Sequence, residues 1–412
     1  MKSSRLLTAT MLFFVMSSLL AQESTKTSTH GTINVLVGNK YGIVVATDSR
    51  ASDKTFRTIN DRSHKLFQLD STTVCSIAGF ASDPGPHWEL GLSTGGIIHA
   101  FAEAMADSPS KVPFRTQVFV LPHLIGSRLG SLEAEYQSSS EKRTPNADHL
   151  FLIFAGLDDH GILSTAKVEI SIQAVPRSDG KYEFLPKISD PQFNTITSGF
   201  FYLTSGVDDS AQLRLHSPGS FEDEPELNEY RHAVQEGKTG NLSLDQLEEL
   251  AKYLVVDASR TAHVVGGPIQ VALISSGGAL MKMPSNLVPD TKPYSTVLFR
   301  GIGQSQSPIY PMVRTVPHSV FLDSHCDDAA IILDDSIFVG GRFINCNFYY
   351  DGKDVYRDPS VHVVGGQLIL GPDVSLTNLD VERVRKEFPE LTPISYKDLP
   401  DAEIVKEHVW PK

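Results

Sequence analysis

Clustered basic residues, zinc-type cysteine and histidine spacings, and any long apolar run beyond Ala21 are lacking in this chain of 412 residues. Its formal net charge is −13, from 49 acidic against 36 basic side chains. Binding to a nucleic-acid backbone requires gathered lysine and arginine, so this balance argues against a nucleic-acid partner. The remaining composition is that of a globular protein with a sizeable core.

Cysteine is also scarce, and the three present are too few for a disulfide scaffold. Cys75 lies in the apolar run VCSIAG and is predicted to be a buried thiol. A disulfide between Cys326 and Cys346 is left open by the sequence. The contiguous residues His325, Cys326, Asp327 and Asp328 have metal-ligand chemistry, but adjacent ligands rarely converge on one ion. We therefore expect no metal and no cofactor.

The first residues have the pattern of a signal peptide. Lys2 and Arg5 precede an apolar stretch from Leu6 to Leu20, and Ala21 offers a small residue for cleavage. The stretch is short for a membrane span, which needs about 20 residues. We expect residues 1–21 to be removed and the protein to be exported, periplasmic or secreted, with no integral membrane span. Leu19 fits the cleavage pattern imperfectly, which leaves an uncleaved N-terminal anchor as the alternative.

A polar segment, residues 22–31, has no periodicity and is interpreted as a propeptide. From Thr32 the character changes to short strand-like runs in two hairpins, the first turning at Gly38-Asn39-Lys40. Helical spacing, further strands and more helices follow. The expected strands are 32–39, 41–50, 64–70, 72–80, 149–159, 161–172, 194–202, 268–275 and 279–284, and the expected helices are 88–105, 116–136, 208–215 and one starting at Ser243.

Ser243 and Gln246 form a capping-box pattern before an amphipathic run, and we prefer this interpretation to a glycosylation sequon at Asn241. The order of strands, helices, strands, helices and strands predicts an α+β fold. We expect a four-layer αββα sandwich over residues 32–284, with two face-to-face sheets and helices outside both.

A Pro, Asn and Asp-rich boundary lies at Ser285–Pro293. Beyond it, residues 294–412 contain short strands punctuated by Gly, Asp and Asn, which predict a small β-solenoid-like module of stacked rungs. Asn378–Phe388 is expected to form a helix that caps one end. Such a module offers an extended surface for a glycan or for self-assembly.

The run from Gly31 to Ser52, GTINVLVGNKYGIVVATDSRAS, resembles the start of the proteasome β-subunit and HslV family of N-terminal nucleophile (Ntn) hydrolases. In that family a Gly-Thr bond is cleaved autocatalytically and the exposed threonine opens the first strand. The resemblance covers roughly residues 32–284, strongly at the front and loosely afterwards. It implies a threonine-type peptidase or amidase, self-processed at Gly31, with Thr32 as the nucleophile.

The chemistry of threonine explains why this nucleophile must be N-terminal. A threonine hydroxyl is a weak nucleophile until a base accepts its proton, and an N-terminal threonine carries that base in its own α-amine. The pKa of such an amine, about 8, leaves a neutral fraction at physiological pH. An internal Thr32 has no free amine, so processing would switch the enzyme on.

The resemblance also assigns roles to Asp48, Lys65, Gly79 and Ser205. Lys65 would lower the pKa of the nucleophile, Asp48 would hold Lys65, the Gly79 N–H would form the oxyanion hole, and Ser205 would relay a proton. Each position also has a purely structural interpretation. In it Thr32 starts a strand, Asp48 and Ser205 are turn residues, Lys65 is solvated, and Gly79 is a packing residue in a strand.

One position departs from the family. An Asp and a Ser normally precede the Gly266-Gly267 pair, and here Ala262 and Val265 stand in their places. The sequence does not choose among nearby Asp257, Ser259 and His263 as substitutes. This departure supports the alternative of a catalytically silent, proteasome-like scaffold or binding protein.

The family's primary pocket corresponds to Ala51, Ile77 and Ala81, all apolar, which predicts neutral or apolar residues before the scissile bond. We expect a peptide or small amide substrate. The resemblance also implies a homo-oligomer, although the insertions at Pro176–Asp190 and Ser217–Gly240 would alter or block a ring.

Overall fold

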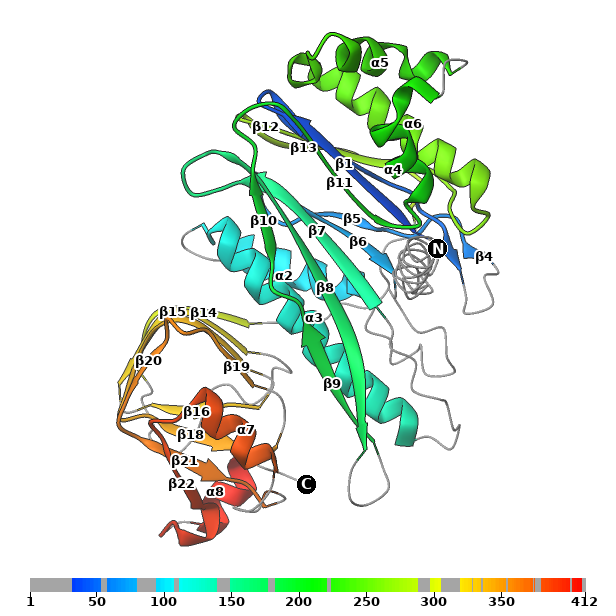
Figure 1. The fold of residues 1–412 in the computed structure, drawn as a ribbon. Coiled ribbons are helices and arrows are strands. Elements are labelled where there is room, and N and C mark those ends of the chain that lie inside the picture. Colours follow the sequence, from blue (N-terminus) through cyan, green and yellow to red (C-terminus); the bar gives the residue numbers. More distant parts are fainter. Residues whose placement is uncertain are drawn as a thin grey trace, which may run out of the picture.

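The protein is described by a computed structural model and is a mixed α/β structure with several sheets (Figure 1). The structure describes residues 32–52, 58–79, 94–106, 111–138, 149–176, 182–220, 224–287, 297–304, 319–327, 329–334, 336–352, 355–372, 374, 379–400 and 402–409. The predicted signal peptide and propeptide, with Gly31, lie outside these ranges. Within the described part, no helix is both long and apolar enough to cross a membrane.

The first sheet has the strand order β11-β1-β2-β12-β13, and all its pairings are antiparallel. The predicted hairpin at its centre is present, because Asn39 pairs with Gly42 across the turn. Its strands are β1 (Ile33–Asn39), β2 (Gly42–Thr47), β11 (Phe200–Gly206), β12 (Gln270–Ser275) and β13 (Gly278–Lys282).

The second sheet has the order β10-β8-β7-β6-β5, with β9 paired to β8. Strand β9 lies in the segment that the sequence analysis treated only as an insertion. The strands are β5 (Leu66–Gln68), β6 (Thr73–Gly79), β7 (His149–Leu157), β8 (Leu163–Pro176), β9 (Tyr182–Ile188) and β10 (Gln192–Thr195). A separate short ribbon joins β3 (Ala51–Ser52) to β4 (Thr58–Asn60).

The two sheets pack face to face through a shared apolar layer. Leu36 and Val45 of the first sheet belong to the same buried cluster as Val74 and Ile153 of the second. Side chains alternate along a strand, so the other face of each sheet needs its own cover. Strands β1 and β2 are buried at every position, as expected for strands covered on both faces.

Helices supply that cover on each outer face (Figure 1). Apolar residues of the first sheet cluster with α4, α5 and α6, and those of the second sheet cluster with α2 and α3. The helices are α2 (Thr94–Ala106), α3 (Phe114–Ser138), α4 (Asp209–His216), α5 (Asn228–Gln235) and α6 (Leu244–Thr261). Single 3-10 turns occupy Pro218–Ser220, Pro225–Leu227, Thr239–Asn241 and Tyr396–Asp398.

Helix α6 begins as its sequence predicts. Ser243 Oγ accepts the Gln246 N–H at 3.2 Å, while Gln246 Oε1 accepts the Ser243 N–H at 2.7 Å. This reciprocal capping box satisfies two N–H groups that otherwise lack helical partners. Helix α5 was not foreseen, because its residues lie in a segment interpreted as an insertion.

The C-terminal part contains two parallel sheets, β14-β15-β17-β19 with β20 beside β17, and β16-β18-β21-β22. Aromatic rings fill the space inside, and Phe321 stacks on Phe338 with centroids 4.6 Å apart. The elements are β14 (Val297–Gln304), β15 (Ser319–Asp327), β16 (Ala330–Ile332), β17 (Ser336–Ile344), β18 (Asn347–Tyr350), β19 (Val355–Arg357), β20 (His362–Val364), β21 (Gln367–Leu370), α7 (Leu379–Glu387), β22 (Thr392–Ser395) and α8 (Ala402–Val409).

This C-terminal part packs against α3. Val320 and Ile337 share a buried cluster with α2 and α3 residues, and the His123 ring lies 3.6 Å from the Tyr356 ring between centroids. Cys326 and Cys346 are thiols, and Cys346 Sγ donates to the Cys326 carbonyl oxygen at 3.3 Å. The disulfide left open by the sequence is therefore not formed.

Candidate functional site

Thr32 lies where β1 begins, between the two sheets, with 4% of its surface exposed. Its carbonyl oxygen accepts the Val207 N–H at 2.8 Å. Gly206 makes this approach possible, because a Cβ at that position would overlap the Thr32 carbonyl. Gly206 also has a φ of 90°, which favours glycine. The backbone of Thr32 is thus held by the end of β11.

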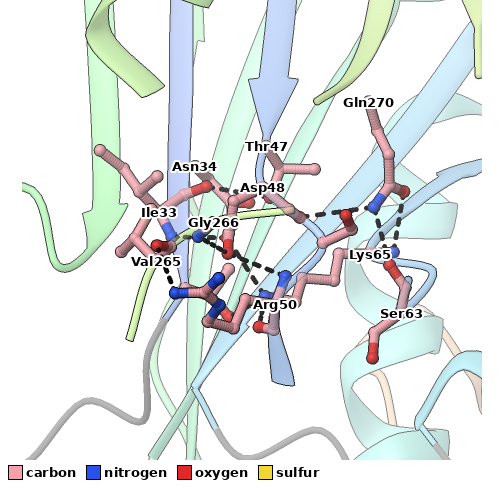
Figure 2. A network of polar contacts seen from close by, with 12 residues as sticks. Ile33, Asn34, Thr47, Asp48, Arg50, Ser63, Lys65, Val265, Gly266 and Gln270 are labelled. Carbon is pink, nitrogen blue, oxygen red and sulfur yellow. Dashed lines mark hydrogen bonds and ion pairs between the residues drawn. The ribbon is translucent and has the colours of Figure 1, made fainter. Parts of the chain in front are cut away.

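Lys65, which directly precedes β5 of the second sheet, reaches Thr32 with its side chain. Figure 2 shows Lys65 together with Asp48 and Arg50. Its Nζ donates to Thr32 Oγ1 at 2.7 Å, to Asp48 Oδ1 at 3.1 Å, and to the Arg50 carbonyl oxygen. Only 2% of Lys65 is exposed. The ammonium group has three N–H bonds, and each of them has an acceptor here.

Asp48 follows β2 and is completely buried. Besides Lys65, its carboxylate accepts the backbone N–H groups of Ile33 at 3.1 Å, Arg50 at 3.0 Å and Gly266 at 3.1 Å. A buried carboxylate needs such donors to offset the loss of water. Asp48 therefore ties Lys65 to the start of β1 and to the Gly266 loop.

Burial lowers the pKa of Lys65 below its usual range, while the charge of Asp48 opposes this shift. Burial also raises the pKa of Asp48, opposed by Lys65 and by the N–H donors of Gly266 and Ile33. A cation within hydrogen-bond distance of a hydroxyl favours loss of the hydroxyl proton. The Lys65 and Asp48 pair thus places a cation at the Thr32 hydroxyl.

Gln270 is a site residue that sequence reasoning missed. Its Oε1 accepts the backbone N–H groups of Lys65 at 3.0 Å and Leu66 at 3.1 Å. Its Nε2 donates to the carbonyl oxygens of Ser63 at 2.8 Å and Asp48 at 3.4 Å (Figure 2). A lone glutamine in an apolar strand, PIQVALIS, was the available signal, since a polar side chain there must find partners.

Arg50 organises the neighbouring loop and was also missed, although it lies in the DSR motif. Its guanidinium pairs with Asp61 at 2.6 Å and donates to the His263 carbonyl at 2.5 Å. The Asp61 pairing lowers the pKa of that carboxyl. Through these contacts Arg50 holds the chain that carries Gly266 beside Asp48.

Gly79 ends β6, buried, with a φ of 103°. A Cβ on Gly206 would lie 3.3 Å from the Ala78 Cβ, so the end of β6 lies beside the residue that contacts Thr32. Ser205, 2% exposed, precedes Gly206 and accepts a hydrogen bond from Asn34 Nδ2 at 3.2 Å. The structure thus brings Asp48, Lys65, Gly79 and Ser205 to one region around Thr32.

The possible substitutes for the missing Asp and Ser have other partners. Asp257 accepts from Arg214 Nη2 at 3.0 Å, and Ser259 Oγ donates to the Val256 carbonyl at 2.6 Å. His263 is exposed. Among the described residues, none of these three side chains is hydrogen-bonded to Thr32, Lys65 or Asp48, so none takes the relay position.

Two of the three predicted pocket residues lie in the described part of the chain. Ala51 is half-buried on β3, while Ile77, 1% exposed, packs in the apolar cluster beneath α2 and α3. Ile77 is therefore a core residue in this structure. Ala81 lies outside the described residues, as does Asp328.

The C-terminal ligand-type residues diverge, because His325 is exposed while Cys326 is buried. Across the described ranges, no three His, Cys, Asp or Glu side chains lie close enough to hold a metal ion. Searches against protein-family models and against curated proteins find no match to this chain.

Proposed function

We propose that the protein is a threonine-type N-terminal nucleophile hydrolase that cleaves amide bonds through an acyl-enzyme on Thr32. The observation that carries the proposal is the buried contact between Lys65 Nζ and Thr32 Oγ1, with Asp48 behind it. A threonine that merely starts a strand has no need of a buried ion pair at its hydroxyl. Burying two charged groups costs desolvation free energy, so a buried ion pair at this hydroxyl favours a functional interpretation.

The residues divide the reaction among them. The α-amine of Thr32, free after processing, accepts the Oγ1 proton while Oγ1 attacks the substrate carbonyl carbon. Lys65 favours that proton transfer, and the Gly79 N–H is the proposed donor to the oxyanion. The amide nitrogen takes a proton from the α-ammonium and leaves, and water then releases the acyl group.

The layered packing supports assignment to the Ntn class. A helical layer, two face-to-face sheets and a second helical layer follow one another, with Thr32 at the start of a central strand. We propose a four-layer αββα sandwich of the proteasome type for residues 32–284, joined to a β-solenoid-like module at 294–412. The parallel, in-register strands β15, β17 and β20 support the solenoid assignment.

We further propose an exported enzyme that acts on short peptides or small amides, self-processed at Gly31-Thr32, and a homo-oligomer. The catalytically silent scaffold is the second candidate. The observation in its favour is Val265, which is fully buried among apolar side chains where the family has a serine.

Intact mass and N-terminal sequencing of the purified, exported protein test the proposal. The wild type and Thr32→Ser are expected to begin at residue 32, since both carry a hydroxyl. Thr32→Val, which replaces the hydroxyl by a methyl group, is expected to retain Gly31. If all three proteins begin at the same residue before Thr32, the hydrolase proposal fails and the scaffold is favoured.

A further inference from the structure

Ser205 has lost the partners that the resemblance leads one to expect. Ala262 directly follows α6 and carries no polar side-chain atom, and Val265 packs in the apolar cluster under that helix. The Gly266 loop therefore supplies no side chain to orient the Ser205 hydroxyl. Any side chain that orients Ser205 must come from another element.

Asn34 of β1 is the side chain that contacts the Ser205 hydroxyl. In the ladder between β1 and β11, Asn34 lies directly opposite Ser205, and its Nδ2 donates to Ser205 Oγ at 3.2 Å. Asn34 is fully buried and Ser205 is 2% exposed. A directly opposed pair in an antiparallel ladder has a geometry set by the strands rather than by flexible loops.

Asn34 also faces the same side of β1 as the nucleophile. Leu36 belongs to the layer between the sheets, while Val35 and Val37 belong to the helix-covered face. Side chains alternate, so Thr32, Asn34 and Leu36 share the inter-sheet side. The contact of Thr32 Oγ1 with Lys65, which directly precedes β5 of the second sheet, agrees with this placement.

The other end of the Asn34 amide lacks a donor. Its Oδ1 is buried and has no hydrogen-bond partner among the described residues. Buried amide oxygens are nearly always paired, so this oxygen is open to a further hydrogen-bond donor. Processing at Gly31 would create such a partner, because an α-ammonium has N–H donors that an internal peptide unit lacks.

We propose that Asn34 replaces the missing Asp and Ser as the positioning residue of the Thr32 α-amine, holding Ser205 through Nδ2 and facing the amine with Oδ1. This inference rests on the proposed hydrolase function. Because Ser205 accepts from Asn34, its orientation is restricted, and its second lone pair is available to the α-ammonium. Both acceptors stabilise the ammonium formed when Thr32 Oγ1 loses its proton.

The test measures acylation of Thr32 by a small β-lactone as a function of pH. Thr32 Oγ1 attacks the lactone carbonyl, the ring C–O bond breaks, and the released alkoxide takes up the proton. Intact mass counts the acylated chains, so no natural substrate is needed. Each full chain is produced with Thr32 directly behind a removable fusion partner, which frees the α-amine whether or not the chain processes itself.

Two near-isosteric variants are expected to shift the acid limb of the profile in opposite directions. Asn34→Leu removes both contacts, so the ammonium is less stable, the amine pKa falls and the acid limb moves to lower pH. Because the amine is then a weaker base, the rate on the plateau of the profile drops by about tenfold. Asn34→Asp adds a negative charge, so the amine pKa and the acid limb rise. Thr165→Val, which removes a fully buried hydroxyl on β8, is the control and is expected to keep the wild-type profile.

A merely structural Asn34 would not give opposite shifts. Unchanged acid limbs in both variants, with wild-type labelling at Thr32 intact, would overturn the role of Asn34 alone. Absence of labelling in the wild type would overturn the proposed function instead. If Asn34→Leu does not fold, Asn34→Ser takes its place and is expected to shift in the same direction.

Discussion

Gln270 lies on β12 of the first sheet and Lys65 directly precedes β5 of the second, yet Gln270 Oε1 accepts the Lys65 backbone N–H at 3.0 Å. The same side chain donates to the Asp48 carbonyl at 3.4 Å. The Gln270 side-chain amide therefore links the backbone of Lys65 to the backbone of Asp48. The position of Lys65 Nζ at Thr32 depends on this link as well as on its own side chain.

Replacing Gln270 by leucine is expected to lower both stability and the rate of Thr32 acylation. The change leaves buried N–H and carbonyl groups unpaired, at a cost of about 3 kcal/mol in the free energy of unfolding. Gln117→Leu is the matched control, since Gln117 is also fully buried but bonds to Asp70 and Val112. Urea unfolding and β-lactone labelling should show a stability loss in both variants and a slower labelling rate in Gln270→Leu only.

Gly206→Ala is expected to displace Thr32 and abolish processing. The added methyl group would overlap the Thr32 carbonyl, in a backbone conformation that already disfavours a side chain. Gly199→Ala is the control, because Gly199 has a φ of 77° but open space around the added Cβ. N-terminal sequencing that finds residue 32 at the start of the Gly206→Ala protein would contradict this prediction.

Removing one member of the Lys65 and Asp48 pair is expected to destabilise the protein more than removing both. Lys65→Met leaves a buried carboxylate without its cation, at about 3–5 kcal/mol, and eliminates labelling of Thr32. In the double variant with Asp48→Asn no buried charge is left, so part of the stability returns while labelling stays absent. A double-mutant cycle by urea unfolding measures the coupling, and strictly additive losses would argue against a buried ion pair.

Acid is expected to weaken the packing around His123. Burial lowers the pKa of His123 to about 4 from 6.5. The unfolded chain therefore binds the proton more readily, and stability present above pH 6.5 is lost as the pH falls towards 4. The loss is about 3 kcal/mol. His123→Phe keeps a ring against Tyr356 and should flatten this part of the stability profile.

His64 titrates in the same range, because burial also lowers its pKa to about 4. The informative quantity is thus the difference between the wild type and His123→Phe, measured by urea unfolding at several pH values. Parallel profiles for the two proteins would assign the pH dependence to groups other than His123.

Local patterns in the sequence predicted most of the described elements. The hairpin of β1 and β2 and the capping box of α6 follow from signals within a few residues of each other. Strand β9 and helix α5 were missed because they occur in polar segments where tertiary packing outweighs weak local preference. The pocket role predicted for Ile77 stays a prediction; the structure adds that its side chain lies in the apolar cluster with α2 and α3, since the face that a strand residue presents depends on how the sheet is covered.

The sequence by itself determined which residues are the candidates for the proposed chemistry: Thr32 at the start of a strand, with Asp48 and Lys65 following in the same two hairpins. Only the tertiary structure decided their partners. Asn34 and Ser205 meet because β1 and β11 pair in one register, and Gln270 reaches Lys65 because two sheets pack face to face. Arg214 donates to Asp257, so Asp257 does not take the place of the missing Asp in the proposed proton relay. Such contacts join residues far apart in the chain, so they are set by the packing of whole layers rather than by local sequence.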